Sequence, residues 1–222
     1  MFRILGLLIC LSTSIANGGV VYELNFDSAI PAYSQSGGDG SPSLNLTGTG
    51  SIGNGAVLSF TPANASDGAV NFFSNVSLNM GDLLGNPIST QASDYTFSFD
   101  AKVEGLESPN TNAYVQAQFK LAGETYQSGF NVTEQFASYQ FTLPSGPLDP
   151  AAFTSDSPRP EFRFDVFSIG SRFGTDTGNS LSVDNLRISE VTAVPEPSSM
   201  ALLAIGGAGL VWRRRRANKS AA

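Results

Sequence analysis

Apolar and polar residues alternate with a period of two through much of the chain between residues 20 and 188. In the segment 95–103 every odd-numbered residue is apolar and every even-numbered residue is polar. The segment 113–121 repeats this pattern, and Tyr114 is the one aromatic residue at its polar positions. Such alternation is typical of a strand that buries one face and exposes the other in an antiparallel sheet. The pattern predicts two long half-buried strands.

Shorter segments show weaker forms of the same alternation. They are residues 20–26, 56–60, 69–73, 126–130, 138–143, 161–168 and 181–188. Clusters of Gly, Pro, Asn, Asp and Ser lie between them, for example at 34–42 and 144–150, and these residues favour turns. No segment of this region has a helical periodicity long enough to favour a helix over a strand. Many short strands separated by turns predict an all-β fold, an antiparallel β-sandwich or a barrel with one core, for residues 17–190.

The apolar phase of the last strand slips by one residue. Leu181 and Val183 share one phase, whereas Leu186 and Ile188 share the other, and the slip falls at Asp184-Asn185. A β-bulge inserts one extra residue and re-aims the side chains that follow it. The slip therefore predicts a bulge at this position.

The first sixteen residues have the pattern of a signal peptide. Arg3 precedes an apolar run at 4–11, and small residues lead up to Ala16. The alternatives are a first apolar strand or a membrane anchor, but eight apolar residues are too few to span a bilayer. We predict removal of residues 1–16 by signal peptidase. The only cysteine, Cys10, would leave with them, so the mature protein would hold no thiol or disulfide.

Residues 191–222 have the order of parts found in a sorting tail. Pro195, Glu196 and Pro197 precede an apolar run of thirteen residues at 200–212. As a helix at ~1.5 Å per residue, this run reaches roughly 20 Å, against a hydrocarbon core of about 30 Å, so we expect a short transmembrane helix that spans the bilayer only if the bilayer is thinned or the helix is extended or helped. Four arginines then stop the chain in the cytoplasm, because burying them is costly. They are Arg213, Arg214, Arg215 and Arg216.

This tail resembles the PEP-CTERM sorting signal that exosortases process. The resemblance implies that Pro195, Glu196 and Pro197 form the recognition motif. It also implies that the tail crosses the inner membrane transiently. The body would then reach the cell surface, the outer envelope or the extracellular matrix. The alternative is an ordinary tail anchor with a Pro-rich stalk, which proline would keep extended.

The charge and composition of the body restrict its chemistry. Residues 17–194 hold six basic and eighteen acidic side chains, a formal net charge of −12, which disfavours nucleic acid and anionic lipids as partners. The chain has no histidine, so catalytic triads and His-ligated metal sites cannot form. A two-carboxylate glycosidase remains open, with Asp100 and Glu104 or Glu161 and Asp165 as pairs four residues apart. Surface charge is the simpler interpretation, so we expect no catalytic residues and no enzyme.

The strands at 21–27, 95–102, 138–142 and 181–188 give the body a further resemblance. In order and character they are similar to carbohydrate-binding-module-like jelly rolls of the galactose-binding type. That resemblance implies a jelly-roll β-sandwich, with a structural Ca²⁺ ion held by Asp184 and Asp27. Carboxylates suit calcium, which takes oxygen ligands. The alternative is that both aspartates are solvated residues at strand ends.

Three tyrosines are candidates for contact with a glycan, since sugar sites combine aromatic side chains with a few polar groups. They are Tyr33, Tyr114 and Tyr126, which we expect in a loop or on polar faces. The only tryptophan, Trp212, lies in the tail, which disfavours a strong polysaccharide binder. We therefore expect a structural or adhesive surface protein. The alternative is a carbohydrate-binding module with structural calcium and extracellular polysaccharide as its partner.

Overall fold

The computed structural model describes residues 19–27, 38–72, 89–108, 110–155, 158–175 and 178–191. The predicted signal peptide, the sorting tail and Tyr33 lie outside these residues. Within the described residues, no helix has both the length and the apolar content needed to cross a membrane. Residues 19–191 form one compact unit.

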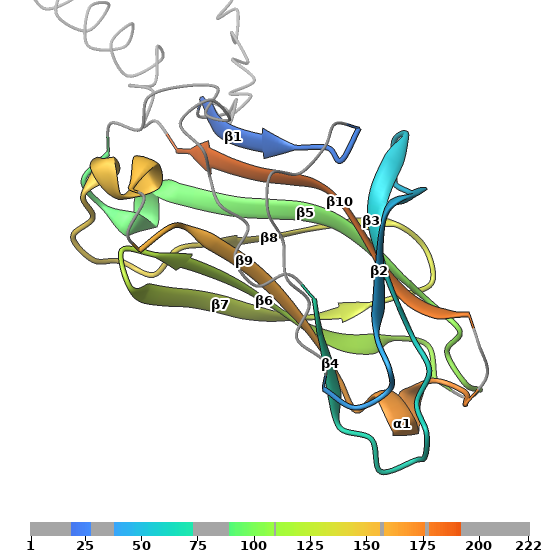
Figure 1. Cartoon of the computed structure of the whole chain (residues 1–222). Helices are drawn as coiled ribbons and strands as arrows, with labels where there is room; N and C mark the ends of the chain where they lie inside the picture. Colours follow the sequence, from blue (N-terminus) through green and yellow to red (C-terminus); the bar gives the residue numbers. More distant parts are fainter. Residues whose placement is uncertain are drawn as a thin grey trace, which may run out of the picture. The chain divides into compact units, whose positions relative to one another are not determined.

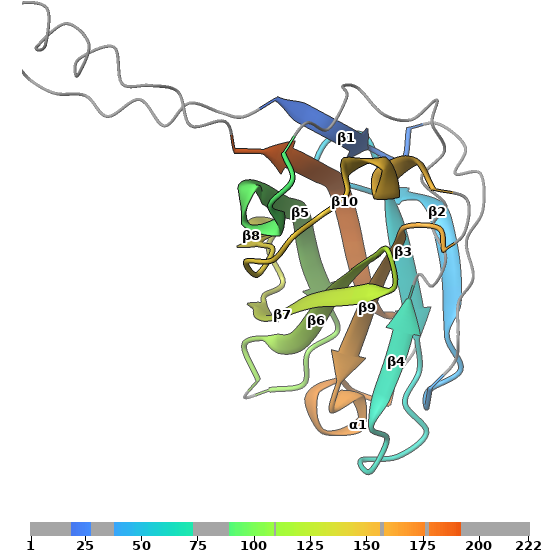
Figure 2. The ribbon, with the colours of Figure 1, turned by 90° about the vertical axis from the view of Figure 1, so that its left-hand side faces the viewer.

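Two antiparallel sheets pack face to face (Figures 1 and 2). The six-stranded sheet has the order β2-β3-β10-β5-β8, with β1 also paired to β10. Its strands are β1 (Val20–Leu24), β2 (Ser43–Thr49), β3 (Asn54–Phe60), β5 (Tyr95–Glu104), β8 (Ala137–Thr142) and β10 (Asn179–Glu190). The four-stranded sheet has the order β4-β9-β6-β7, built from β4 (Ala69–Phe72), β9 (Glu161–Phe167), β6 (Ala113–Leu121) and β7 (Glu124–Val132). The predicted all-β, antiparallel β-sandwich of the jelly-roll type is confirmed.

Among the described residues, three short helical segments lie outside the sheets. They are η2 (Ala92–Asp94), η3 (Pro150–Thr154) and α1 (Ile169–Arg172). Asp149 begins η3, where its carboxylate accepts a hydrogen bond from the Ala151 N–H at 2.9 Å. This is the usual role of an aspartate at the start of a helical turn, because the first N–H groups have no partner within the helix.

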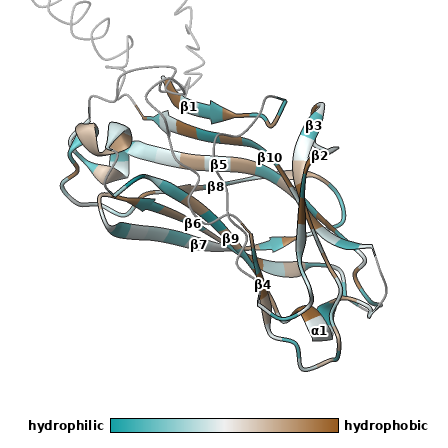
Figure 3. Cartoon of the chain, in the orientation of Figure 1, coloured by the Kyte–Doolittle hydropathy of each residue, from teal (hydrophilic) through white to brown (hydrophobic). Residues whose placement is uncertain are grey.

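Phenylalanine side chains from both sheets interlock to form the core. Figure 3 shows the alternation of hydrophobic and hydrophilic residues along the strands that turns one face of each sheet inward. Phe97 of β5 stacks on Phe162 of β9 with ring centroids 5.2 Å apart, and Phe99 meets Phe164 edge-on at 4.9 Å. Full burial of each ring contributes about 1.5–3 kcal/mol of transfer free energy. The two strands with the strongest alternation, β5 and β6, bury their apolar faces as predicted.

The bulge predicted in the last strand is present. The register of β10 against β5 shifts between Asp184 and Arg187, and Asn185 has a left-handed φ of 48°. On one side of the shift β10 pairs with β3, and on the other side it pairs with β1. Because of the extra residue, both apolar phases of β10 face the core.

One strand was not predicted. Leu44 and Leu46 supply only two alternating apolar residues in β2, and Gly48 follows where another would be needed. Gly48 packs closely against the next strand, since a Cβ at this position would lie 2.1 Å from the Val57 side chain. Pairing with β3, rather than local pattern, places β2 in the sheet.

A core truncation tests the interlocked packing of the two sheets. Phe97→Ala removes a ring that contacts both sheets, and we expect it to lower the free energy of unfolding by about 3–5 kcal/mol. Urea unfolding of residues 17–194 measures this value. The control is Ser98→Ala on the opposite face of β5, expected to change stability by less than about 0.5 kcal/mol. Equal effects of the two variants would contradict the assigned faces.

Candidate functional site

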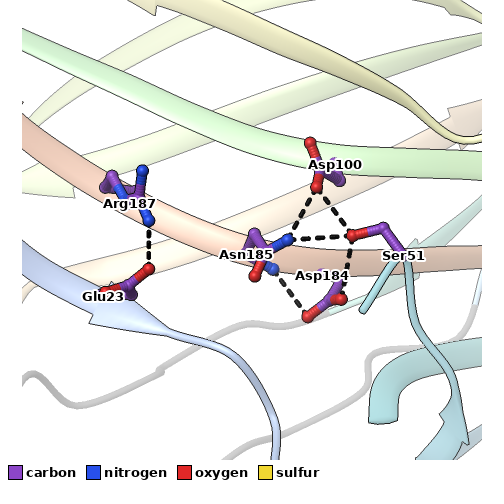
Figure 4. Close-up of polar contacts among 6 residues, drawn as sticks. All are labelled: Glu23, Ser51, Asp100, Asp184, Asn185 and Arg187. Carbon is purple, nitrogen blue, oxygen red and sulfur yellow. Dashed lines mark hydrogen bonds and ion pairs between the residues drawn. The ribbon is translucent and has the colours of Figure 1, made fainter. Parts of the chain in front are cut away.

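A polar cluster sits on the outer face of the six-stranded sheet at the bulge (Figure 4). We call it the bulge cluster, and it consists of Ser51, Asp100, Asp184 and Asn185. Ser51 Oγ lies 2.7 Å from Asp100 Oδ2 and 3.0 Å from Asp184 Oδ2. Asn185 Nδ2 donates to Asp100 Oδ2 at 2.8 Å and to Ser51 Oγ at 2.9 Å. The left-handed backbone of Asn185 thus aims its amide into the cluster.

Asp184 fixes the turn between β2 and β3. Its side chain is fully buried, and Oδ2 accepts a hydrogen bond from the Ile52 N–H at 3.0 Å. Oδ1 accepts from the Asn185 N–H at 2.7 Å. Gly50 lies directly against this carboxylate, since a Cβ there would be 2.5 Å from Oδ2. The turn is therefore held onto the sheet by a buried carboxylate, and its exposed tip is Ile52.

The second predicted calcium ligand, Asp27, binds the same turn at another point. Its Oδ1 accepts a hydrogen bond from the Asn54 N–H at 3.1 Å. Within the described part of the chain, no three acidic side chains lie close enough together to hold a metal ion. Calcium takes about six to eight oxygen ligands, so a site at this turn would need backbone carbonyls beside the two carboxylates. Asp184 is buried and so is not a solvated residue, whereas Asp27 is exposed and binds one backbone N–H group.

The electrostatics of the cluster favour a charged Asp100. Burial raises the pKa of this carboxyl, but hydrogen bonds from Ser138, Asn185 and Ser51 outweigh burial, and the net effect lowers the pKa. The positive charge of Arg187 adds to the lowering. Arg187 also forms an ion pair with Glu23 of β1 (Figure 4). The cluster therefore joins β5, β10 and the β2–β3 turn through charged hydrogen bonds, and the separate Glu23–Arg187 pair joins β1 to β10.

The outer face of the four-stranded sheet offers a different kind of surface. Along β6 and β7 it carries one aromatic side chain and several amides, which we call the amide face: Tyr114, Gln116, Gln118, Gln127 and Asn131. Gln118 Nε2 donates to Gln116 Oε1 at 3.0 Å and to Asp165 Oδ2 of β9 at 2.9 Å. These bonds orient the amides in the middle of the face.

Tyr114 lies across the neighbouring strand β7. A Cβ built on Gly129 would lie 1.9 Å from Tyr114 Oη and 2.4 Å from its Cζ, so the ring occupies the space that a side chain at this position would fill. The ring of Phe167 on β9 is 5.8 Å away on the other side. Tyr114 remains 43% exposed. It is one of three large apolar side chains exposed among the described residues, with Ile52 and Val191.

The other candidate tyrosines do not join Tyr114. Tyr126 pairs with Phe119 across the β6–β7 ladder and packs against the core, so it is on the inner face rather than on a polar face as expected. In β7 the inner face holds Tyr126, Ser128 and Phe130. Because the middle residue of the three is a polar serine, the alternation of apolar and polar residues is hidden in the sequence. Tyr33 lies outside the described residues.

The carboxylates considered for glycoside hydrolysis all have partners in the structure. Asp100 belongs to the bulge cluster, and Glu104 forms an ion pair with Lys102. Glu161 pairs with Lys120 at 3.1 Å, and Asp165 with Arg163 at 2.8 Å. In both candidate catalytic pairs, Asp100 with Glu104 and Glu161 with Asp165, the two carboxylates bind different side chains.

Several residues of these two surfaces were not foreseen. Ser51 reaches Asp184 across 133 positions in sequence, and no local pattern reveals that contact. The glycines around Ser51 were the one available signal, since a glycine often marks a close approach of the backbone. Gly129 and Phe167 were likewise found only through the pairing of β6 with its two neighbours.

Residues 193–216 match the family described as the PEP-CTERM protein-sorting motif. This agrees with the resemblance noted in the tail, and the motif indicates an exported protein that exosortase sorts to the cell surface or the extracellular space. The match covers the tail alone and does not assign a family to the body. A search of curated proteins found no match.

Solved structures similar to the chain include carbohydrate-binding modules. One is the N-terminal cellulose-binding domain of Cellulomonas fimi β-1,4-glucanase C, with a TM-score of 0.41, 19% identity, and coverage of 76% of this chain and 95% of that one. Another is the family 11 carbohydrate-binding module of a cellulosomal cellulase of Clostridium thermocellum, with a TM-score of 0.44, 14% identity, and coverage of 81% and 99%. At these values the similarity carries no argument about a ligand or a site.

The charge of Asp100 makes the stability of the bulge cluster depend on pH. The folded state lowers the pKa of this carboxyl below its usual 3.8, so the stabilisation is complete above about pH 5 and is lost as the pH falls through the folded value. We expect Asp100→Asn to be less stable than wild type near neutral pH, with the difference narrowing in acid. Urea unfolding of residues 17–194 across this range measures the difference.

The control for this experiment is Glu124→Gln, which changes an exposed carboxylate at the start of β7. It should follow the wild-type curve. A difference between Asp100→Asn and wild type that stays constant from neutral pH into acid would contradict the proposed role of the Asp100 charge.

Proposed function

We propose that the exported, exosortase-sorted chain delivers its β-sandwich to the cell surface or the extracellular matrix, where it serves as a non-catalytic adhesive module for neutral polysaccharide. The observation that carries the binding proposal is the amide face, on which Tyr114 lies over Gly129 with 43% of its side chain exposed. The sorting motif at 193–216 supports the location.

The side chains of the amide face suit a sugar. An aromatic ring offers an apolar surface to the C–H groups of a pyranose, while the ring hydroxyl and the amides can donate to and accept from its hydroxyls. Gln127 and Asn131 are exposed beside Tyr114 on β7, and Gln116 is half-buried next to it on β6. A strand face spaces such groups regularly, as an extended polysaccharide would require.

The charge of the body favours a neutral polymer over an anionic one. Residues 17–194 carry a formal net charge of −12, so a polysaccharide rich in carboxylates or sulfates would be repelled over distances of about 10 Å at ordinary ionic strength. Neutral hydroxyl groups meet no such barrier. The hydrogen-bonding amides are indifferent to salt, so retention on a neutral polymer should not depend on ionic strength.

A structural calcium ion held by Asp27 and Asp184 is the second part of the proposal. It is supported by the convergence of both carboxylates on one turn, where Asp27 binds the Asn54 N–H and Asp184 binds the Ile52 N–H. Bound there, calcium would supply a positive charge between two carboxylates, one after β1 and the other at the bulge of β10. It would stabilise the fold and take no part in a reaction.

Substitutions at Tyr114 and Gly129 test the binding surface. Tyr114→Ala should weaken retention on an insoluble neutral polysaccharide by roughly 10- to 30-fold, as expected for truncation of a central aromatic contact. Gly129→Ala should also weaken it, because the new methyl group forces the ring away from its position over β7. Pull-down isotherms across a panel of neutral polymers measure the change.

The matched controls are Tyr114→Phe, which keeps the ring, and Tyr126→Phe, which alters the inner face. Both should bind within a few-fold of wild type, and all variants should unfold cooperatively. Unchanged retention of Tyr114→Ala on every polymer that wild type binds would remove the amide face as the site.

Calcium binding is tested by thermal unfolding of the body with added calcium and with a chelator. A ligand that binds only the folded state raises the midpoint as its concentration rises. We expect calcium to raise the midpoint of wild type, and Asp184→Asn to abolish that rise. A wild-type midpoint that is the same in calcium and in chelator would exclude the ion.

A further inference from the structure

The first and last described residues of the body lie side by side. The Glu190 N–H donates to the Gly19 carbonyl at 3.0 Å, and Val20 stands opposite Ser189 in the ladder of β1 and β10. Figures 1 and 2 show β1 beginning where β10 ends. We call this region the terminal end of the sandwich. Both segments that continue outside the described body therefore leave it from one place.

Hydrogen bonds hold β10 firmly up to its last residue. The Val191 N–H donates to the Asp94 carbonyl at 2.5 Å, and Glu190 Oε1 accepts from the Ser89 N–H at 2.5 Å. Tyr95 Oη donates to the Ser89 carbonyl at 2.9 Å. Burial, with Glu190 nearby, raises the pKa of Tyr95 to about 12, so this hydroxyl remains a donor. The backbone is therefore fixed to the folded body up to Val191.

The sorting motif follows at once. Pro195 is four residues beyond Val191, and the apolar run begins nine residues beyond it, at Met200. A fully extended chain covers at most ~3.3–3.6 Å per residue, so the four residues from Val191 to Pro195 can reach at most about 14 Å and the nine residues to Met200 at most about 32 Å. A membrane enzyme that binds the motif must therefore come into contact range of the terminal end.

The opposite end of the sandwich is far from this region. The twelve residues of β10 span about 40 Å at ~3.3 Å per residue. At the far end lie α1 and the β3–β4 loop, which approach each other at Gly170 and Ala65. β5 ends at Glu104, which stands opposite Ser180 at this far end of β10. β6 begins after the loop that follows Glu104, so Tyr114, at the start of β6, also lies toward the far end.

We propose that the terminal end, formed by Gly19, Gln91, Asp94, Ser145 and Val191, is the surface that exosortase covers while the tail is uncleaved, with the Tyr114 end pointing away. The inference rests on the proposed sorting of the chain. A protein surface fits better than lipid headgroups, since a body of net charge −12 is repelled by anionic lipids. The contact ends when the tail is cut.

Single cysteines test this arrangement in the full chain, because the sequence holds no cysteine besides Cys10. Ser145→Cys lies at the terminal end, in the exposed loop after β8 that meets η2 through the Gly146 carbonyl. Gln91→Cys is a second exposed position at this end, and Ala65→Cys is an exposed position at the far end. Spheroplasts with active exosortase are treated with a bulky, membrane-impermeant maleimide.

The uncleaved and cleaved forms are separated by size and compared for labelling. Ser145→Cys and Gln91→Cys should label several-fold more slowly in the uncleaved form, whereas Ala65→Cys should label equally in both. Inserting about ten Gly/Ser residues after Val191 should abolish the protection and preserve cleavage. Equal labelling of all three positions, with normal cleavage, would overturn the inference alone. Absence of any cleaved form would overturn the proposed sorting and the inference together.

Discussion

The strand β10 is the element on which the rest of the sandwich depends. It pairs with β1, β3 and β5, and it can do so only because one extra residue at Asp184-Asn185 changes its register partway along. The bulge lets both halves of the strand bury their apolar side chains in one core. It also leaves Asp184 on the outer face, where its buried carboxylate fixes the turn between β2 and β3. Removing the bulge would force one half of β10 to expose its apolar residues.

Much of this could be predicted from sequence, and the failures have identifiable causes. The alternation in β5 and β6 is strong because each buries five apolar residues on one face, and the phase slip in β10 reveals its bulge. β2 was missed because Gly48 interrupts its pattern, and its place depends on β3. Tyr126 was assigned to a polar face because Ser128 hides the inward phase of β7. Contacts such as Ser51 with Asp184 join distant parts of the chain, so no local pattern could reveal them.

The two outer faces of the sandwich have different characters, which suggests a division of roles. The six-stranded sheet holds buried and paired charges that connect strands and pin a turn. The outer face of the four-stranded sheet carries an exposed tyrosine and several amides along β6 and β7, beside the Lys120–Glu161 and Arg163–Asp165 ion pairs. Gly129, which stands opposite Gln116 and diagonal to Tyr114, leaves room for the tyrosine ring to lie across the sheet. The proposed binding surface and the stabilising cluster are therefore separate, and substitutions can address one without the other.

The account given by the tail and the body is of a protein that is exported, processed and then displayed. The intact mass of the protein recovered from the cell surface tests this account most directly. The account predicts a chain that begins at Asn17 and lacks both the apolar run at 200–212 and the arginine cluster at 213–216. A surface protein whose mass still includes that cluster would show a permanent tail anchor and would contradict the account.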